Sequence, residues 1–392
     1  MIKTAVVLAG GKGVRLRPLT LTTPKPLLPV GNKPIIDHIL SLLATHGFER
    51  IVVAVNYLGH KILAHVLERY LDAGLEILIP RIKPNDTADA VRKISAFLDE
   101  DFIVTMGDVL TNMNLRQFAD FHSRSDAIAS VALIEVGSVR EFGAVILDES
   151  GRILHFMEKP GASEWYVANI AYSTLLRKYY RPYSNLANSG FYAFKYEILE
   201  VLSENPYLMD FGRHVFPWLL ENNYKVLGWN AEDTYWIDVG RPATYLAANM
   251  DLLDGAALPL TPYGENFGGV WLGRNTVINE EAIINPPVAV GDNTVVDGDA
   301  IIGPYAVIGS GVKIGKAAHV AHAVIMDGCV LEDRTKVKNS ILAKNILVRS
   351  DSTVEEYSVL GDNAVIESGL SIGPAVLLNP GSKISDKRGG VA

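Results

Sequence analysis

The sequence predicts an α/β domain with a mostly parallel sheet, followed by a solenoid of short parallel strands. Over residues 1–246, short apolar runs alternate with amphipathic segments of helix length. That alternation is typical of a parallel sheet covered by helices on both faces. After residue 268, one aliphatic residue recurs at every sixth position, a period that neither a helix nor an isolated strand produces. Residues 247–268 are therefore expected to form a linker.

Strands and helices can be assigned in order along the first part. The strand-like apolar runs are residues 51–55, 75–79, 101–108 and 128–136. The segments with helical spacing are residues 34–47, 60–71 and 87–98, and Gly47 closes the first of them. In sheets built this way, ligands bind beyond the carboxyl ends of the strands. We therefore look for functional residues where these strands end.

The second part, residues 269–385, has a repeat of six residues. The inward positions of its first series are Leu272, Ile278, Ile284, Val290, Val296, Ile302, Ile308, Ile314 and Val320. The series resumes out of phase as Leu342, Val348, Val354, Leu360, Ile366, Ile372, Leu378 and Ile384. A looped-out or irregular coil is therefore expected within residues 321–341. The pattern resembles the hexapeptide-repeat, left-handed parallel β-helix, and residues 386–392 are expected to be a tail.

Composition limits the possible functions. The chain has 392 residues, 48% of them hydrophobic, a net charge of −8 and a single cysteine, Cys329. This cysteine content predicts no internal disulfide and is typical of a cytoplasmic protein. The charge and the lack of basic tracts argue against nucleic acid as a partner. Because no apolar run reaches about 18 residues, we expect no membrane span.

The N-terminal strand runs directly into a glycine-rich, basic stretch, LAGGKGVRLRPLTLTTPKP. Glycines allow backbone amides to approach an anion closely, and nearby cations add charge. The glycines are Gly10, Gly11 and Gly13, and the cations are Lys12, Arg15, Arg17 and Lys25. The pattern is neither a P-loop nor a complete GxGxxG motif. It predicts a loop that holds an anionic ligand.

The stretch resembles the signature of sugar-1-phosphate nucleotidyltransferases, with Val14 at a position usually held by Ser or Thr. Four further segments resemble motifs of this family in the same order: MGDVLTNMNL, FGAVILDESGRILHFMEKPG, NSGFYAF and YWIDVGRPATYLAAN. The resemblance implies a Rossmann-like catalytic domain over residues 1–246. It also implies a reaction that joins a nucleoside triphosphate to a sugar 1-phosphate and releases pyrophosphate.

The resemblance assigns the residues that handle phosphate and metal. Asp108 and Asp238 would hold Mg²⁺, the expected cofactor, because this cation prefers carboxylate oxygens shared with substrate phosphates. Arg15 and Lys25 would bind the triphosphate and stabilise charge on the departing pyrophosphate. Lys159 would hold the sugar 1-phosphate. No protein nucleophile is required, because a phosphate monoester is already an anion near neutral pH.

The resemblance also assigns the substrate contacts. Glu158, Asn188 and Gly190 would line the sugar pocket. The nucleotide-binding positions would be Leu8, Ala9, Gly10, Gly11, Gly13, Arg81, Thr87 and Gly107. Asp86 departs from the family pattern, because it stands where a glycine is expected beside the base. Its side chain and its negative charge would both disfavour an incoming triphosphate.

Several functional alternatives stay open at this stage. The overall sequence looks most like mannose-1-phosphate guanylyltransferases, so GTP and mannose 1-phosphate are the preferred substrates. Glucose-1-phosphate adenylyl-, thymidylyl- or uridylyltransferase activity is the alternative within the family. His319 and His322 raise a second possibility, an acyltransferase activity of the solenoid. A third is an inactive regulatory paralogue, which Asp86 and Val14 would favour.

Two further expectations concern assembly. The solenoid is expected to contribute to a homo-oligomer, because an exposed end of stacked strands is an edge that partners commonly cover. Segment 161–187 is longer than the family pattern and rich in aromatic residues. It could serve as a lid or as an oligomer contact.

Overall fold

The computed structural model describes residues 2–70, 74–138, 142–161, 164 and 185–385. The expected tail and most of segment 161–187 lie outside these residues. The chain divides into two compact units. The first comprises Met1–Gly11, Ile39–Gly107 and Met113–Trp236, and the second comprises Lys12–His38, Asp108–Asn112 and Ile237–Ala392. The second unit therefore contains the solenoid together with two short segments from the N-terminal half.

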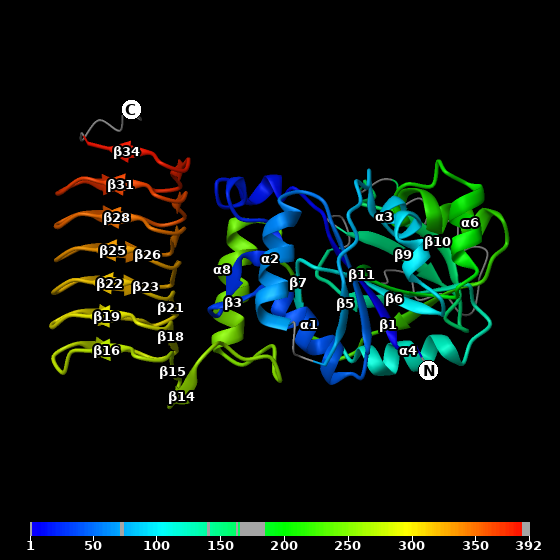
Figure 1. Cartoon of the computed structure of the whole chain (residues 1–392), viewed down its shortest axis with the longest axis horizontal. Helices are drawn as coiled ribbons and strands as arrows, with labels where there is room; N and C mark the ends of the chain where they lie inside the picture. Colours follow the sequence, from blue (N-terminus) through cyan, green and yellow to red (C-terminus); the bar gives the residue numbers. More distant parts are fainter. Residues whose placement is uncertain (1, 71–73, 139–141, 162–163, 165–184, 386–392) are drawn as a thin grey trace. The chain divides into compact units, whose positions relative to one another are not determined.

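The first unit is built on a nine-stranded sheet with the main order β10-β9-β11-β6-β1-β4-β5, and β8 pairs with β11 and β12 (Figure 1). Its strands are β1 (Thr4–Ala9), β4 (Arg50–Val55), β5 (Glu76–Leu78), β6 (Phe102–Met106), β8 (Ala129–Glu135), β9 (Gly143–Leu147), β10 (Ile153–Glu158), β11 (Leu186–Phe194) and β12 (Val226–Asn230). Strands β6, β1, β4 and β5 are parallel to one another. This confirms the α/β class with a parallel sheet.

The other part of the sheet is mostly antiparallel, although β12 runs parallel to β8. Strand β11 runs antiparallel to β6, β8 and β9, and β10 runs antiparallel to β9. The register between β11 and β8 shifts between Asn188 and Tyr192. Such an irregularity bends a strand and redirects its side chains. It lies within the NSGFYAF motif.

Helices and short helical turns connect the strands. The helices are α1 (Ile35–Thr45), α2 (Gly59–Tyr70), α3 (Thr87–Lys93), α4 (Leu115–Ser123), α6 (Ile198–Glu204), α7 (Phe216–Glu221) and α8 (Pro242–Leu253). The short turns are η1 (Val14–Leu16), η2 (Leu19–Leu21), η3 (Lys25–Leu27), η4 (Ser95–Phe97) and the π-type η6 (Phe211–Val215). Helices α1 and α2 match the sequence prediction, and Gly47 follows α1 with φ of +77°.

The helix expected over residues 87–98 is shorter than predicted. Helix α3 ends at Lys93, and η4 continues as a separate 3-10 turn. Ile94 is fully buried and leaves helical geometry, and its N–H donates to both Ala90 O and Val91 O. The helix therefore ends at this buried residue. The apolar spacing of residues 87–98 did not predict that end.

Aromatic packing forms the core beneath η6. The rings of Tyr192, Phe194, Phe211 and Phe216 lie with centroids 5.0–6.3 Å apart. All four residues are at most 5% exposed. Such offset and tilted ring pairs add to the stabilisation from burial. They hold β11, which carries the NSGFYAF motif, against η6 and α7.

The solenoid has three sheets of stacked parallel strands, drawn from yellow to red in Figure 1. The first sheet contains β14 (Glu265–Phe267), β15 (Val270–Leu272), β18 (Val288–Val290), β21 (Ala306–Ile308), β24 (Ala323–Ile325), β27 (Ile341–Leu342), β30 (Val359–Leu360) and β33 (Leu377–Leu378). Only β14 is antiparallel to its neighbour. This arrangement confirms the β-helix.

The other two sheets are built in the same way. One contains β16 (Val277–Ile278), β19 (Val295–Val296), β22 (Lys313–Ile314), β25 (Val330–Leu331), β28 (Leu347–Val348), β31 (Val365–Ile366) and β34 (Lys383–Ile384). The other contains β17 (Ile283–Ile284), β20 (Ile301–Ile302), β23 (His319–Ala321), β26 (Lys336–Lys338), β29 (Thr353–Val354) and β32 (Ser371–Ile372). Cys329 is buried in the solenoid, and burial raises its thiol pKa to about 12.

The phase shift in the repeat comes from two shortened steps. Val288 pairs with Ala306, 18 residues on, whereas Ala306 pairs with Ala323 and Val324 with Ile341, each 17 residues on. The inward series therefore runs from Val320 to Ile325 and from Val337 to Leu342, in steps of five. Of the two expected forms, the irregular coil is the one observed: one residue is omitted at each of two corners, and the coils stay stacked without a looped-out segment.

Two short pairs of strands complete the second unit. Strand β2 (Pro29–Val30) is antiparallel to β3 (Lys33–Pro34), and β7 (Val109–Thr111) pairs with β13 (Trp236–Asp238). Among the described residues, no helix is long and apolar enough to cross a membrane. Both strands of the β7–β13 pair adjoin aspartates of the sequence motifs, Asp108 and Asp238.

Adjacent valines of β19 provide a matched test of the solenoid. Val296 is 1% exposed and points inward, whereas Val295 is 36% exposed. We expect Val296→Ala to lower the free energy of unfolding by about 2 kcal/mol, through lost burial and a cavity. Val295→Ala should cost less than about 0.5 kcal/mol. Urea unfolding followed by circular dichroism measures both, and equal losses would contradict the inward assignment.

Candidate active site

The glycine loop follows β1, whose six residues are all buried. A Cβ on Gly10 would lie 3.1 Å from Asn56 Cβ, whereas one on Gly11 would meet open space. Leu8 and Ala9 are buried at the end of the strand. Gly107 follows β6, and its N–H donates to Leu8 O at 2.9 Å. A Cβ there would lie 3.1 Å from that same oxygen, so a side chain at position 107 would separate the two strand ends.

These two strand ends lie at the switch point of the parallel sheet. From β1 the chain passes to β4 and β5 on one side, and it then returns to β6 on the other side of β1. Loops that diverge at such a point leave a crevice at the carboxyl ends of the strands, where ligands bind. Gly10, Gly11 and Gly107 are thus placed where backbone can approach a ligand.

Gly13 belongs to the second unit and requires glycine for two reasons. Its φ is +57°, and a Cβ would lie 2.9 Å from Thr20 Cγ2 and 3.3 Å from Lys25 Cβ. The Thr20 hydroxyl donates to Gly13 O at 2.7 Å. The loop is therefore folded back onto the segment that carries Lys25. Val14, at the position where the family usually has a hydroxyl, is 55% exposed.

Two aspartates and a lysine converge in the second unit. Lys25 Nζ lies 2.6 Å from Asp108 Oδ2 and 2.9 Å from Asp238 Oδ1. Arg15 Nη2 lies 3.5 Å from Asp238 Oδ2. The Lys25 side chain is 7% exposed, and the carboxylates are 26% and 30% exposed. These four residues, the charge cluster, come from three separate chain segments.

Backbone pairing brings the two aspartates together. Asp108 immediately precedes β7, and Asp238 ends β13, the strand that pairs with β7. The N–H of Val239 donates to Asp108 O at 3.3 Å. Because the side chains are fixed by a strand pair, their spacing does not depend on long flexible connections.

The electrostatics of Lys25 are set by two opposing effects. Burial lowers the pKa of the ammonium group, but the charges of Asp108 and Asp238 and the hydrogen bonds to them raise it above its ordinary value overall. The group therefore stays protonated across the neutral range, and it can neutralise negative charge. It is not available as a general base.

Gly240 is a site residue that the sequence assignment missed. A Cβ at this position would lie 2.7 Å from Asp238 Oδ2 and 2.9 Å from Arg15 Nη2. Its φ is not in the left-handed region, so a larger residue is opposed only by lack of space and would have to displace the end of the Asp238 or Arg15 side chain. The available signal was its place in the WIDVG motif, two residues after Asp238.

The donor set fits a magnesium ion. In the part of the chain that the structure describes, no group of three or more His, Cys, Asp or Glu side chains is arranged to hold a metal. The two aspartates, however, already converge on one cation, the Lys25 ammonium. Mg²⁺ is commonly bound by one or two carboxylates together with substrate phosphates. The charge cluster thus suits a metal that arrives with its substrate.

The residues expected to bind sugar meet in the first unit. A Cβ on Gly143 would lie 3.0 Å from Asn188 Cβ and 3.1 Å from Glu158 Oε2. The small size of Gly143 therefore lets Glu158 of β10 and Asn188 of β11 lie close together. Lys159 is paired with Glu158 and adopts φ of +49°. Gly143 was not assigned from the sequence, although it lies in the FGAVIL segment.

The irregular part of β11 orients Asn188 through hydrogen bonds. Asn188 Oδ1 accepts from Gly190 N–H at 2.9 Å, and Asn188 Nδ2 donates to the Tyr192 hydroxyl at 3.0 Å. Gly190 has φ of +83°, and a Cβ would lie 2.6 Å from Met106 Cγ. Burial raises the Tyr192 pKa, so its hydroxyl stays neutral. Tyr192 is a third residue missed by the sequence assignment, after Gly240 and Gly143.

The residues expected near the base are not drawn into one cluster. The Thr87 hydroxyl donates to Asp210 Oδ2 at 3.0 Å and accepts from Phe211 N–H at 3.1 Å, so structural contacts already use it. Asp86 caps α3 by accepting from Thr87 N–H, and burial and then the nearby Asp210 raise its pKa. Arg81 is exposed.

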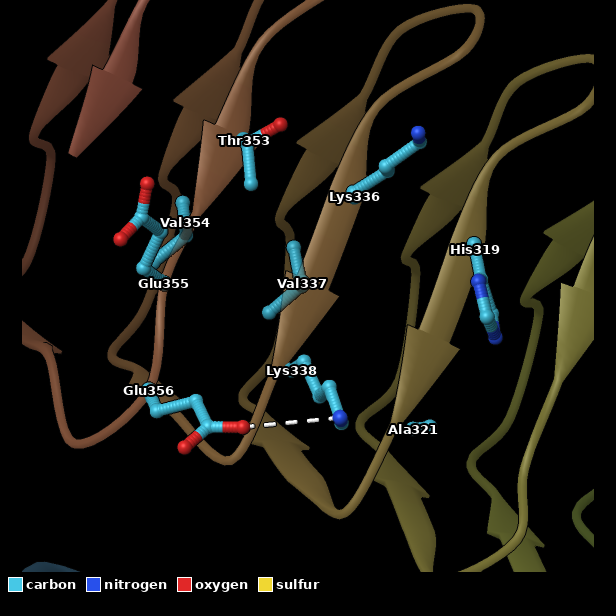
Figure 2. Close-up of a pocket in the computed structure, with 9 residues that line it drawn as sticks. All are labelled: His319, Ala321, Lys336, Val337, Lys338, Thr353, Val354, Glu355 and Glu356. Atoms are coloured by element: carbon cyan, nitrogen blue, oxygen red, sulfur yellow. Dashed lines mark ion pairs between the residues drawn. The ribbon is translucent and has the colours of Figure 1, made fainter. Parts of the chain in front are cut away.

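A groove of about 350 Å³ crosses the outer face of β23, β26 and β29 (Figure 2). Its lining comprises His319, Ala321, Lys336, Val337, Lys338, Thr353, Val354, Glu355 and Glu356. Lys338 Nζ lies 3.5 Å from Glu356 Oε1. Among the described residues, the lining includes one histidine and no tyrosine. It therefore differs from the catalytic stretch that the acyltransferase alternative would require.

Comparison with known proteins identifies the family of the chain. A model of the nucleotidyl transferase family matches residues 4–255. The chain belongs to the nucleotidyl transferase family. A second model, the GMPPB C-terminal domain, matches residues 284–388. Nucleotidyltransferases of this family act on a nucleoside triphosphate and a sugar 1-phosphate, and they generally use Mg²⁺.

Curated relatives resemble the chain over most of its length. It is 28% identical to a mannose-1-phosphate guanylyltransferase of Mycobacterium tuberculosis over 85% of this chain and 81% of the relative. It is 30% identical to a mannose-1-phosphate guanyltransferase of Candida albicans over 95% of both chains. It is also 30% identical to a UTP–glucose-1-phosphate uridylyltransferase of Synechocystis over 94% of this chain and 90% of the relative. Relatives of different printed substrates are thus about equally similar.

The crowding around Gly240 gives a testable consequence for this nucleotidyltransferase. We expect Gly240→Ala to reduce turnover roughly 10- to 100-fold, because the added methyl group must displace Asp238 or Arg15. Gly137→Ala is the matched control, since a Cβ there meets nothing within 4 Å. Steady-state kinetics and thermal unfolding of both variants provide the measurement. Wild-type turnover in Gly240→Ala would show that the Asp238–Arg15 geometry is not needed.

Proposed function

We propose that this chain transfers a nucleotidyl group from a nucleoside triphosphate to a sugar 1-phosphate, with GTP and mannose 1-phosphate as its preferred pair. The observation that carries the proposal is the convergence of Lys25, Asp108 and Asp238. The substrate pair is supported by relatives named mannose-1-phosphate guanylyltransferase and by the match to the GMPPB C-terminal domain. Adenylyl-, thymidylyl- or uridylyltransferase activity is the alternative within the family.

The reaction is a single displacement at the α-phosphorus. An oxygen of the sugar phosphate forms a bond to that phosphorus, while the bond to the bridging oxygen of the β-phosphate breaks and pyrophosphate leaves. Both reactants are anions, so charge neutralisation and in-line positioning are the main requirements. Arg15 and Lys25 supply fixed positive charge near the triphosphate. The amides of Gly10, Gly11 and Gly13 contribute hydrogen-bond donors.

Asp108 and Asp238 would hold Mg²⁺ through their carboxylates. When bound, this ion would neutralise charge on the phosphate oxygens. Lys25, which is protonated and buried between the same carboxylates, holds them in place. The protein thereby provides position and charge, and it supplies no nucleophile.

The remaining residues bind the two substrates. Glu158 would accept hydrogen bonds from sugar hydroxyls, with Asn188 and Gly190 completing that pocket, and Lys159 would contact the sugar phosphate. On the nucleotide side, the backbone of Leu8, Ala9 and Gly107 would lie against the nucleoside. Arg81 and Thr87 would lie near the base.

Two further proposals concern the location and the assembly of the enzyme. Both substrates are intracellular metabolites and the single cysteine is unpaired, so we place the enzyme in the cytoplasm. We further propose that it forms a homo-oligomer through the solenoid. Size-exclusion chromatography with light scattering would test the oligomer, and a monomer would contradict it.

Pyrophosphate release tests the function directly. Purified protein with Mg²⁺ is screened with ATP, GTP, UTP, CTP and dTTP against glucose, mannose, galactose and glucosamine 1-phosphates. We expect release with GTP and mannose 1-phosphate to exceed every other pair. Preference for another pair would overturn the substrate assignment. Absence of turnover by a folded protein that binds nucleotide would favour the regulatory alternative, and Asp86 would then be the first residue to replace.

The charge cluster is tested by three variants. We expect Asp108→Asn, Asp238→Asn and Lys25→Ala each to lower turnover about 100-fold or more while the protein stays folded. Asp126→Asn and Lys225→Ala are the matched controls, because they disrupt an exposed ion pair, and such pairs contribute little. Turnover and thermal unfolding are measured for all five. Near-wild-type turnover in the three cluster variants would refute the site assignment.

A further inference from the structure

The β2–β3 hairpin lies directly after the segment that carries Lys25. Its two-residue turn is Gly31–Asn32, with φ of +58° and +62°, the backbone form that joins two antiparallel strands tightly. Each strand has only two residues. A hairpin of this size is not stable by itself in water. Its geometry must therefore be imposed by the residues around it.

Helix α8 supplies much of this support. The Tyr245 hydroxyl donates to Pro29 O at 2.5 Å, and Asn249 Oδ1 accepts from Gly31 N–H at 2.9 Å. Asn249 Nδ2 donates to Tyr245 O at 2.8 Å, which fixes the orientation of its amide. The two residues are four apart on one face of the helix, and both are at most 1% exposed. Two buried polar side chains are thus aimed at the hairpin backbone.

Packing and further hydrogen bonds close the other sides of the hairpin. A Cβ on Gly31 would lie 2.5 Å from Leu252 Cδ2 of α8, so the turn is in direct contact with the helix. Tyr263 N–H donates to Gly31 O at 2.8 Å. Asn32 Nδ2 donates to Ile308 O, in strand β21 of the solenoid, at 2.7 Å. The hairpin is held by α8, by Tyr263 in the segment after α8, and by the solenoid.

The hairpin and α8 each lie close in the chain to one partner of an ion pair. Lys25 is four residues before β2, and Asp238 is four residues before α8. The Lys25 ammonium and the Asp238 carboxylate are 2.9 Å apart. A shift of the hairpin along α8 would therefore move Lys25 relative to Asp238. We propose that Tyr245 and Asn249, assisted by Asn32, are positioning residues that hold Lys25 against the two aspartates.

This inference rests on the proposed function for its kinetic readout, and it has a second readout that does not. In the folded protein Lys25 is 7% exposed, whereas Lys12 in the same loop region is exposed. An amine-reactive reagent should therefore modify Lys12 much faster than Lys25. The ratio of the two rates, measured by peptide mass spectrometry, reports how firmly Lys25 is held.

The test variant is full-length Tyr245→Phe, which removes one oxygen atom and keeps the buried ring. We expect kcat to fall about fivefold or more, KM for each substrate to stay within about twofold, and Lys25 modification relative to Lys12 to rise about threefold. Tyr305→Phe is the control, because it removes a hydroxyl bond to Asp254 Oδ2, at the end of α8, and no bond to the hairpin itself. It should behave as wild type.

A second variant keeps the inference testable if Tyr245→Phe does not fold. Asn32→Gly keeps the positive φ of the turn and removes only the bond to Ile308 O. It should raise Lys25 modification about twofold. The inference is overturned if neither variant changes Lys25 modification, if kcat falls without such a change, or if Tyr305→Phe has the same effect. If the wild type has no turnover, the proposed function fails, and the modification ratio alone decides the inference.

Discussion

The candidate active site depends most on one interaction, the buried ammonium of Lys25 between two carboxylates. Its partners, Asp108 and Asp238, are 83 and 213 residues away in the chain. A buried cation is stable only when it is paired and hydrogen-bonded. The reaction in turn needs fixed positive charge, because two phosphate anions must approach each other. The charge cluster meets both demands by keeping opposite charges fixed in one place.

The supporting structure is made mainly of backbone and of residues without long side chains. The β7–β13 pair fixes the aspartates, and Gly13 and Gly240 leave room for Lys25 and Arg15 beside them. The hairpin after Lys25 is anchored to α8 and to the solenoid. This explains why segments 12–38 and 108–112 belong to the same unit as the solenoid. The β-helix is thus part of the framework that carries the charged residues.

Periodicity and motif order made most of the fold predictable from sequence. The six-residue repeat anticipated the solenoid because each inward position tolerates only an aliphatic residue. The antiparallel strands β9–β11 were not predicted, since pairing direction is set by distant contacts. Likewise, the break after Lys93 coincides with burial of Ile94. The out-of-phase repeat predicted an irregularity within residues 321–341, but not that it consists of two five-residue steps. Each of these features is decided by tertiary packing.

The structure brings together several residues that the sequence predicted for the site, but their contacts with one another were not predicted. Asp108 and Asp238 were expected to act together, but the ammonium of Lys25 between them was not expected. The need for glycine at positions 143 and 240 arises from side chains far away in sequence, Asn188 for one and Arg15 for the other. Local motifs can mark such positions, but only the folded chain shows which atoms would collide.

The central claim is that the protein supplies charge and position while the substrate phosphate itself attacks. The most direct measurement uses a nucleoside triphosphate with sulfur on the α-phosphorus in one known configuration. The configuration of the nucleotide-sugar product is then determined. A single in-line displacement predicts inversion at that phosphorus. Retention would require two displacements through a nucleotidyl–enzyme intermediate, and it would contradict the account.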